Sequence, residues 1–152
     1  MKNLMLRLFA LITLLVTVAF ASAVASVSAQ TPGHNIMANI PFEFSVGDKS
    51  LPAGEYAVGR TNSDGSQLRI SNRETNESAI RLTQTVQATE AKEQSVLVFK
   101  RYGDRYILSE VWLAGESVGR QMFKSSSEKS MDRELAKNKA EAETVTIIAS
   151  IH

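Results

Sequence analysis

Strict alternation of apolar and polar residues over residues 36–46 is the feature that most constrains the fold of this chain. Every second residue there is apolar and would share one face of an extended strand: Ile36, Ala38, Ile40, Phe42, Phe44 and Val46. A repeat of two residues is typical of a β-strand with one buried face. Pro41 has no backbone N–H to donate to a neighbouring strand, so we expect this strand to lie at a sheet edge or to bulge there.

The next part of the chain continues the β pattern, with turns between the strands. Gly47-Asp48-Lys49 and Leu51-Pro52-Ala53-Gly54 predict two turns, and Gly54 is expected to have a positive φ. Asn62-Ser63-Asp64-Gly65 predicts a hairpin, in which Asp-Gly takes the positive φ angles of a type I′ turn. Strands are predicted on either side of these turns, over residues 55–60, 67–71 and 78–87. Their expected inward residues are Tyr56, Val58, Ile80, Leu82 and Val86.

The C-terminal half contains the clearest hairpin and the only predicted helix of the domain. Residues 96–102 and 105–113 are rich in β-branched and aromatic residues and are joined by Gly103-Asp104. A further strand is predicted over residues 118–123. Ser125 and Glu128 have the spacing of a capping box, which predicts that a helix opens at Ser125. Residues 143–151 predict a last strand, with one face formed by Val145, Ile147, Ala149 and Ile151.

Together these patterns predict an all-β fold of about eight strands with one C-terminal surface helix. No alternation of strands and helices is present, so we expect a mainly antiparallel sandwich or partly open barrel. The predicted β domain spans residues 36–152 and follows a polar lead-in at residues 30–35. The chain has no cysteine, so packing and backbone hydrogen bonds must hold this domain together.

Residues 1–29 have the order of parts of a secretory signal peptide. Lys2 and Arg7 supply positive charge, residues 8–20 are apolar, and residues 21–29 are almost all small. The apolar run is short for a membrane span. This pattern predicts an exported protein that meets the membrane only through this leader.

Composition weakens several function classes. The absence of cysteine excludes thiol catalysis and thiolate metal sites. Lys2 and Arg7 lie in the predicted leader, so the remaining chain is close to neutral and lacks the charge of a nucleic-acid binder. His34 and His152 lie near the ends of the predicted domain, where a catalytic or metal site would lack rigid support. We therefore assign no catalytic, cofactor-binding or metal-binding residue.

Two groups of side chains leave other functions open. Glu43, Glu55 and Glu110 fall on predicted strands, and a hydrolase could use such carboxylates across a cleft. By strict alternation, Tyr106, Leu108, Glu110 and Trp112 share one face, which would suit stacking on a sugar ring. Large aromatic side chains are more often buried, so we expect Tyr106 and Trp112 to pack.

The basic residues near this hairpin are interpreted as a solvated face: Lys100, Arg101, Arg105, Arg120 and Lys124.

Two motifs resemble a family of small exported bacterial β proteins. The first combines Ile40-Pro41-Phe42-Glu43-Phe44-Ser45-Val46-Gly47 with Leu51-Pro52-Ala53-Gly54-Glu55-Tyr56. The second is Tyr102-Gly103-Asp104-Arg105-Tyr106-Ile107-Leu108-Ser109 with Val111-Trp112 and Gly119-Arg120. The resemblance implies a secreted or periplasmic β domain and implies no activity. The segment from Leu51 to Val58 is also similar to the turn at the end of prealbumin-like sandwiches, where the tyrosine hydroxyl bonds back to the turn.

The sequence thus favours an exported, non-enzymatic β domain that acts in binding or as an accessory of the cell envelope. An envelope protein or a carbohydrate is the expected kind of partner. Two alternatives stay open, namely a secreted carbohydrate-active hydrolase with carboxylates on different strands and a barrel that carries an apolar ligand.

We predict that signal peptidase removes the leader after Val27-Ser28-Ala29, because small residues fit the cleft of that protease. N-terminal sequencing of the protein from a periplasmic or culture fraction should then begin at Gln30, or at Val24 if Ala21-Ser22-Ala23 is used instead. Recovery of intact Met1 in the membrane pellet would contradict this prediction.

Overall fold

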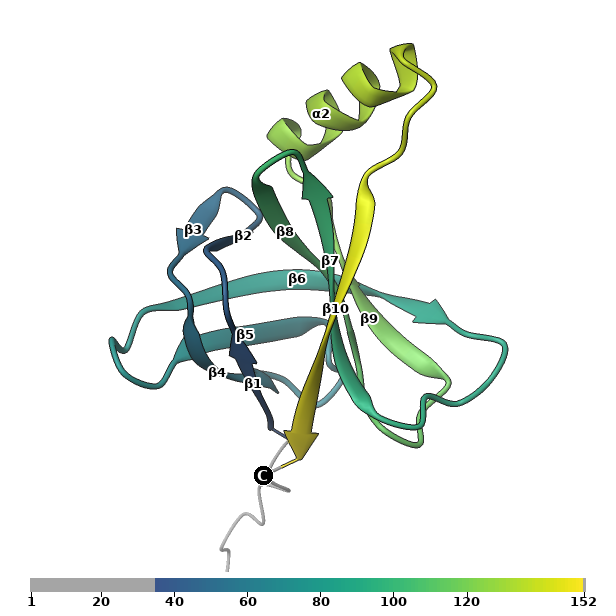
Figure 1. The fold of residues 1–152 in the computed structure, drawn as a ribbon. Coiled ribbons are helices and arrows are strands. Elements are labelled where there is room, and N and C mark those ends of the chain that lie inside the picture. The colour runs from purple at the N-terminus through teal and green to yellow at the C-terminus, as the bar shows by residue number, and fades with distance from the viewer. Residues whose placement is uncertain (1–34, 152) are drawn as a thin grey trace, which may run out of the picture. The chain divides into compact units, whose positions relative to one another are not determined.

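The computed structural model describes residues 35–151, and this part of the chain folds into ten strands and one helix (Figure 1). Residues 1–34 and His152, and with them the predicted leader and both histidines, lie outside the described residues. The elements are β1 Ile36–Ile40, β2 Phe44–Val46, β3 Lys49–Leu51, β4 Gly54–Arg60, β5 Gln67–Asn72, β6 Ser78–Gln87, β7 Ser95–Tyr102, β8 Arg105–Trp112, β9 Val118–Met122, α2 Ser126–Lys137 and β10 Glu143–Ile151. The predicted all-β fold with a C-terminal helix is confirmed.

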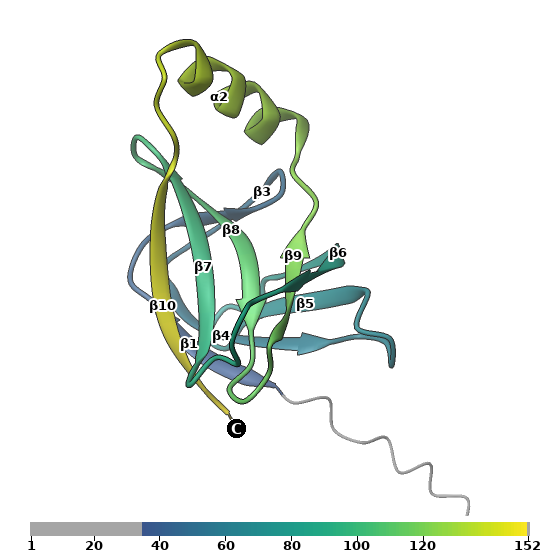
Figure 2. The same ribbon diagram turned by 90° about the vertical axis from the view of Figure 1, so that its right-hand side faces the viewer.

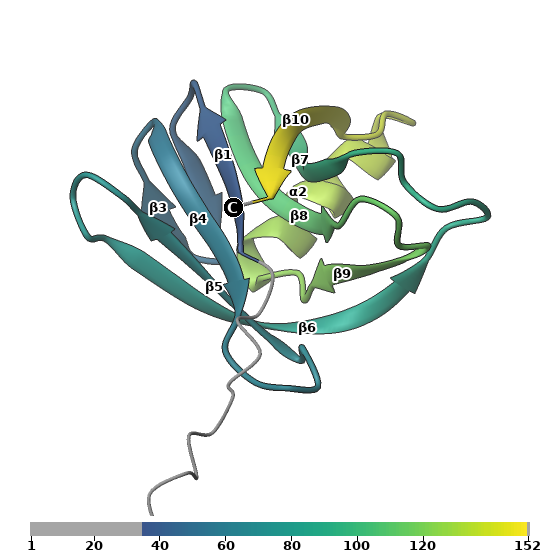
Figure 3. The same cartoon turned by 90° about the horizontal axis from the view of Figure 1, so that it is seen from below.

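Eight of the strands form a closed antiparallel barrel, which Figure 3 shows from below. The order around the ring is β1, β4, β5, β6, β9, β8, β7 and β10, and β10 returns to β1. The first half of β6 pairs with β5 and its second half pairs with β9, so β6 turns a corner of the barrel. The two extra strands form a hairpin, in which β2 runs parallel to the start of β8 and β3 pairs with β2.

The strand predicted over residues 36–46 is interrupted at Pro41. It forms β1 on one side of the break and β2 on the other, because the missing N–H of proline ends the ladder. Phe42, within the break, stacks on Tyr106 with 4.0 Å between ring centroids and meets Phe99 edge to face at 5.3 Å. The break therefore does not expose the apolar face, since Phe42 still packs against the core.

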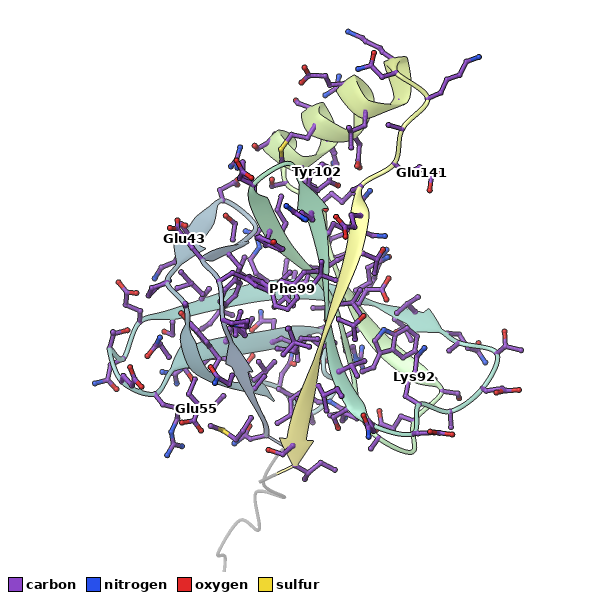
Figure 4. The ribbon with its side chains drawn as sticks, viewed as in Figure 1. Glu43, Glu55, Lys92, Phe99, Tyr102 and Glu141 are labelled. Carbon is purple, nitrogen blue, oxygen red and sulfur yellow. The ribbon has the colours of Figure 1, made fainter. Side chains whose placement is uncertain are left out.

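Aromatic side chains fill the interior of the barrel. Phe44 contacts both Tyr56 and Phe99 edge to face, at centroid distances of 5.0 and 5.4 Å, and Figure 4 shows Phe99 in the middle of the barrel. A cavity of about 20 Å³ remains beside Ile36 and Val58. A space of this size holds about one water molecule. The aromatic rings and fully buried aliphatic side chains such as Ile40 and Leu97 make the barrel interior a packed core.

The turn before β4 has the predicted form. Gly54 has a φ of +154°, and the Tyr56 hydroxyl donates to the carbonyl of Pro52 at 2.7 Å. Tyr56 and Val58 are buried, as expected. This turn therefore places the Tyr56 ring in the core and satisfies its hydroxyl at the same time.

The hairpin between β4 and β5 is not a type I′ turn. Gly65 has a φ of +67°, but Asp64 does not have the positive φ that this turn requires at its first central residue. Instead, Asn62 Oδ1 accepts from the backbone N–H of Gln67, and Asp64 Oδ1 accepts from that of Ser66. These side chains satisfy the backbone of a longer loop, which needs only one residue with positive φ.

In the first half of β6, the inward face is the opposite of the predicted one, whereas near its end Val86 is half-buried and the adjacent Thr85 is exposed. Ala79 and Thr83 are buried, whereas Ile80 and Leu82 are each 57% exposed. The inner positions are filled by small or polar groups that fit their neighbours: Thr83 Oγ1 donates to the carbonyl of Gly65, and the Arg81 guanidinium lies against Gly47. Alternation identifies two faces, but it does not say which face meets the core.

We expect Gly54→Val to destabilise the protein by about 1–3 kcal/mol, because a β-branched residue is strained at this φ. A Cβ at this position would also lie 3.0 Å from Asn72 Nδ2. Chemical denaturation of the variant and of Ala53→Val, an exposed neighbour, measures the difference. Equal midpoints for the two variants would contradict the strain at Gly54.

Candidate functional site

The three carboxylates considered for hydrolysis do not meet. Glu43 lies in the break before β2, where it accepts from the Ser50 hydroxyl at 2.6 Å, and Glu55 is exposed on β4. Figure 4 shows these two side chains at separate places on the outside of the barrel. Glu110 accepts from the Trp112 indole N–H at 2.9 Å and from the Gln121 amide at 3.2 Å. Glu43 and Glu110 are therefore engaged with neighbours of their own, and Glu55 lies apart from both on the surface.

The predicted shared face of Tyr106, Leu108, Glu110 and Trp112 is split by a β-bulge. Phe99 of β7 lies opposite Leu108, but the preceding residue Val98 lies opposite Glu110, so Ser109 is the extra residue. Tyr106 and Leu108 therefore face the core, and Glu110 and Trp112 face outward. One added residue reverses the alternation, which the sequence pattern alone did not reveal.

The expectation that Trp112 packs is confirmed, although it packs on the outside of the barrel. Its side chain is 5% exposed and lies against Gly119 of β9, where a Cβ would come within 2.6 Å of the ring. The Lys92 ammonium lies over the ring at 5.1 Å from its centroid, an arrangement typical of a cation–π contact. Tyr106 is half-buried between Phe42 and the Arg101 guanidinium. Neither ring is free for stacking on a sugar.

The basic residues near the hairpin are distributed among separate partners. Arg101 pairs with Glu143 at 3.2 Å, Lys124 pairs with Asp132, and Arg120 donates to the Asp64 carbonyl at 2.7 Å. Among residues 35–151, no three side chains of histidine, aspartate or glutamate are grouped as a metal site would need. Within the same range, no helix has the length and apolar character to cross a membrane.

A polar cluster that the sequence did not indicate lies at the base of α2. Tyr102, at the end of β7, donates its hydroxyl proton to Asp132 at 2.6 Å and lies 3.5 Å from Glu128. Ser125 caps the helix by accepting from the N–H of Glu128, as predicted. The Glu128 carboxylate turns toward Tyr102, whereas the capping-box prediction directed it to the backbone of Ser125. The available signal was the spacing of Glu128 and Asp132, which places both on one helix face.

The two carboxylates of this cluster have opposite electrostatic environments. Burial raises the pKa of Glu128, whose side chain is 4% exposed, and the nearby Asp132 adds to this effect. Burial also acts to raise the pKa of Asp132, but hydrogen bonds from Lys124 and Tyr102 outweigh it and lower that pKa. Burial and both carboxylates raise the pKa of Tyr102, which therefore remains a hydrogen-bond donor.

Opposite pKa shifts in two neighbouring carboxylates are a pattern of acid–base catalysis. A groove of about 260 Å³ runs beside the cluster and is lined by Tyr102, Lys124, Asp132 and Leu135, but not by Glu128. The carboxyl group with the raised pKa is therefore out of reach of a molecule in this groove. The cluster anchors α2 to the end of β7 through Tyr102, which Figure 4 shows beneath the helix.

The strand that follows α2 presents an unpaired backbone edge. β7 pairs with seven consecutive residues of β10, from Glu143 to Ala149, whereas β1 pairs only with Ser150 and Ile151. Figure 2 shows β10 at the margin of the layer that it forms with β7, β8 and β9. In an antiparallel strand, every second residue directs its N–H and C=O away from a given neighbour. Several backbone groups between Glu143 and Ala149 therefore lack a strand partner among the described residues.

From Thr144 onward, this edge has none of the usual protection against pairing. β6 also has an unpaired edge at residues 78–82, but there Lys49 Nζ donates to the carbonyl of Ser78 at 2.7 Å and Arg81 packs on the β2–β3 hairpin. Charged side chains at an edge hinder the approach of another strand. In β10, by contrast, no residue from Thr144 to Ile151 is charged, and Ile148 is 64% exposed. The edge of β10 from Glu143 to Ala149 is our candidate functional site.

We predict a pH-dependent effect of Glu128→Gln. The pKa of Glu128 in the folded protein is raised above its unfolded value of about 4.3. The free energy of unfolding of the wild type should therefore fall as the pH rises from the unfolded pKa to the folded pKa. The glutamine does not titrate, so the variant should gain stability relative to wild type as the pH rises toward neutrality. Chemical denaturation above about pH 4, where the lowered pKa keeps Asp132 ionised, measures this difference.

The control for that experiment is Glu134→Gln, an exposed position on the same helix. Its effect on stability is subtracted from that of Glu128→Gln at each pH. A difference between Glu128→Gln and wild type that does not change with pH would contradict the raised pKa of Glu128.

Comparison of this chain with protein-family models, with curated proteins and with solved structures finds no match.

Proposed function

We propose that this chain is an exported, non-catalytic β domain that binds a protein partner by adding a strand to β10. The observation that carries the proposal is the pairing of β10, which covers seven of its nine residues along one edge and only two along the other. An exposed strand edge binds extended segments through the same main-chain hydrogen bonds that hold a sheet together. Export is proposed from the charge, apolar run and small residues of positions 1–29.

The interior of the barrel favours binding at the surface over carriage of an apolar ligand. Ligand pockets usually measure about 300–1,000 Å³, whereas the cavity beside Ile36 measures about 20 Å³. Rings of Phe44, Tyr56 and Phe99 occupy the space that a carrier would leave empty.

The environment of the carboxylates likewise favours a binding role over hydrolysis. Glu43 and Glu110 each accept hydrogen bonds from neighbouring side chains. In the cluster under α2, the buried Glu128 does not line the adjacent groove. That cluster supports the helix which precedes β10, and so it supports the start of the proposed binding strand.

Site-specific photo-crosslinking in the cell tests the proposal. A benzophenone amino acid in place of Ile148 should crosslink to a protein in the envelope fraction, because this side chain stands beside the unpaired edge and is 64% exposed. The matched control replaces Leu82, which is 57% exposed on β6. Crosslinking from position 148 well above that from position 82 is the expected result. Equal crosslinking from both positions, or none from position 148, would overturn the proposal.

A further inference from the structure

We infer that the strand added to β10 is β10 of a second copy of this chain, in antiparallel register centred on Thr146. This inference rests on the proposed function, and it names the partner. It predicts a two-fold symmetric dimer in which the layer of β7 and β10 continues into β10 and β7 of the other copy.

The length of the unpaired edge fixes the register. The edge runs from Glu143 to Ala149, and Thr146 is its middle residue. Antiparallel pairing around a two-fold axis at Thr146 matches all seven residues of one edge with the seven of the other. A shift of the axis to a neighbouring position on the same face leaves residues unmatched at both ends. Beyond Ala149 the edge is already occupied by β1.

The sequence of β10 is complementary to itself in this register. Residues that lie opposite each other across an antiparallel pair share one face and contact each other through their side chains. The opposed pairs are Glu143 with Ala149, Thr144 with Ile148, Val145 with Ile147, and Thr146 with Thr146 of the other copy. All but the end pair join two β-branched residues, a class of residue that fits a pleated sheet surface.

Most side chains of β10 are exposed or only partly buried, as expected if another strand packs beside β10 in the dimer. Val145 and Ile147 point toward the core cluster, yet both are only half-buried. In the dimer, Val145 of one copy would contact Ile147 of the other copy. Ile148, on the outer face, would be covered in part by Thr144 of the second copy. These contacts add apolar burial to the main-chain hydrogen bonds.

Charge does not oppose this association. The only charged residue of the edge, Glu143, pairs with Arg101 of its own chain and would lie opposite Ala149 of the other copy. Without Lys2 and Arg7 of the predicted leader, the chain has a formal net charge of −1, so two copies do not repel each other strongly. A second copy is also present wherever the protein is made. Pairing between two copies would cover the edge of β10 and so protect it from unrelated strands.

The first experiment measures the oligomeric state of the leaderless protein by analytical ultracentrifugation over a range of concentrations. The wild type should dimerise, and Thr146→Lys should weaken the dimer at least about tenfold, because two like charges would lie directly opposite each other. The matched control is Ser71→Lys on β5, a strand paired on both sides at this residue. It should dimerise like the wild type. A monomeric wild type, or equal weakening by both variants, would overturn the inference.

The second experiment tests the register by disulfide trapping, for which a chain without cysteine is well suited. Under a mild oxidant, Thr146→Cys should crosslink to itself, because the two side chains face each other across the axis. Thr144→Cys and Ile148→Cys should crosslink when mixed and not when oxidised alone. Efficient self-crosslinking of Thr144→Cys, or of Ser71→Cys as control, would overturn the register.

Failure of this inference can be told apart from failure of the proposed function. If Ile148 crosslinks in the cell only to a different protein and the purified chain stays monomeric, strand addition holds and the second copy is wrong. If neither crosslinks nor dimers form, both are wrong. A crosslinked product with twice the mass of the chain, together with the self-crosslink at position 146, supports both.

Discussion

Aromatic packing in the interior is the interaction on which the barrel depends. Phe44, Tyr56 and Phe99 come from three different strands and meet edge to face, and Phe42 extends the group toward Tyr106. Phe99 is far from the other two in sequence, so its contact with Phe44 joins the N-terminal strands to the central hairpin. Because the chain has no disulfide, such contacts and the closed hydrogen-bonded ring must together oppose the entropy of unfolding.

Closure of that ring depends on a local irregularity. The bulge at Ser109 reverses which side chains of β8 point outward. On one side of the bulge β8 pairs with β2, at Tyr106 and Ile107, and on the other side it pairs with β9, at Glu110 and Val111. The bulge also directs Trp112 outward onto Gly119. Bulges commonly occur where a strand must bend or change neighbours. Here the extra residue allows β8 to pair both with β2 of the β2–β3 hairpin and with β9 of the barrel.

Much of the fold could be predicted from the sequence, because most strands of this chain carry a clear local signal. Pro41, the turn at Gly54 and the cap at Ser125 act through chemistry that is confined to a few residues. The faces of β6 and β8 could not be predicted, since they depend on Gly47, Gly65 and Val98, which contact these strands only after folding. Two further features form only when the ring has assembled, and so they could not be predicted either. They are the cluster of Tyr102, Glu128 and Asp132 and the unpaired edge of β10.

The position of Trp112 has a practical consequence for spectroscopy. It is the only tryptophan of the chain, and it is held between β8 and β9 at the place where the ring closes. Its indole N–H is bound to Glu110, and a cation lies over the ring. Separation of β8 from β9 would take Gly119 away from the ring and expose the indole to water. The intrinsic fluorescence of this protein therefore reports on one seam of the barrel, and it does so without any introduced label.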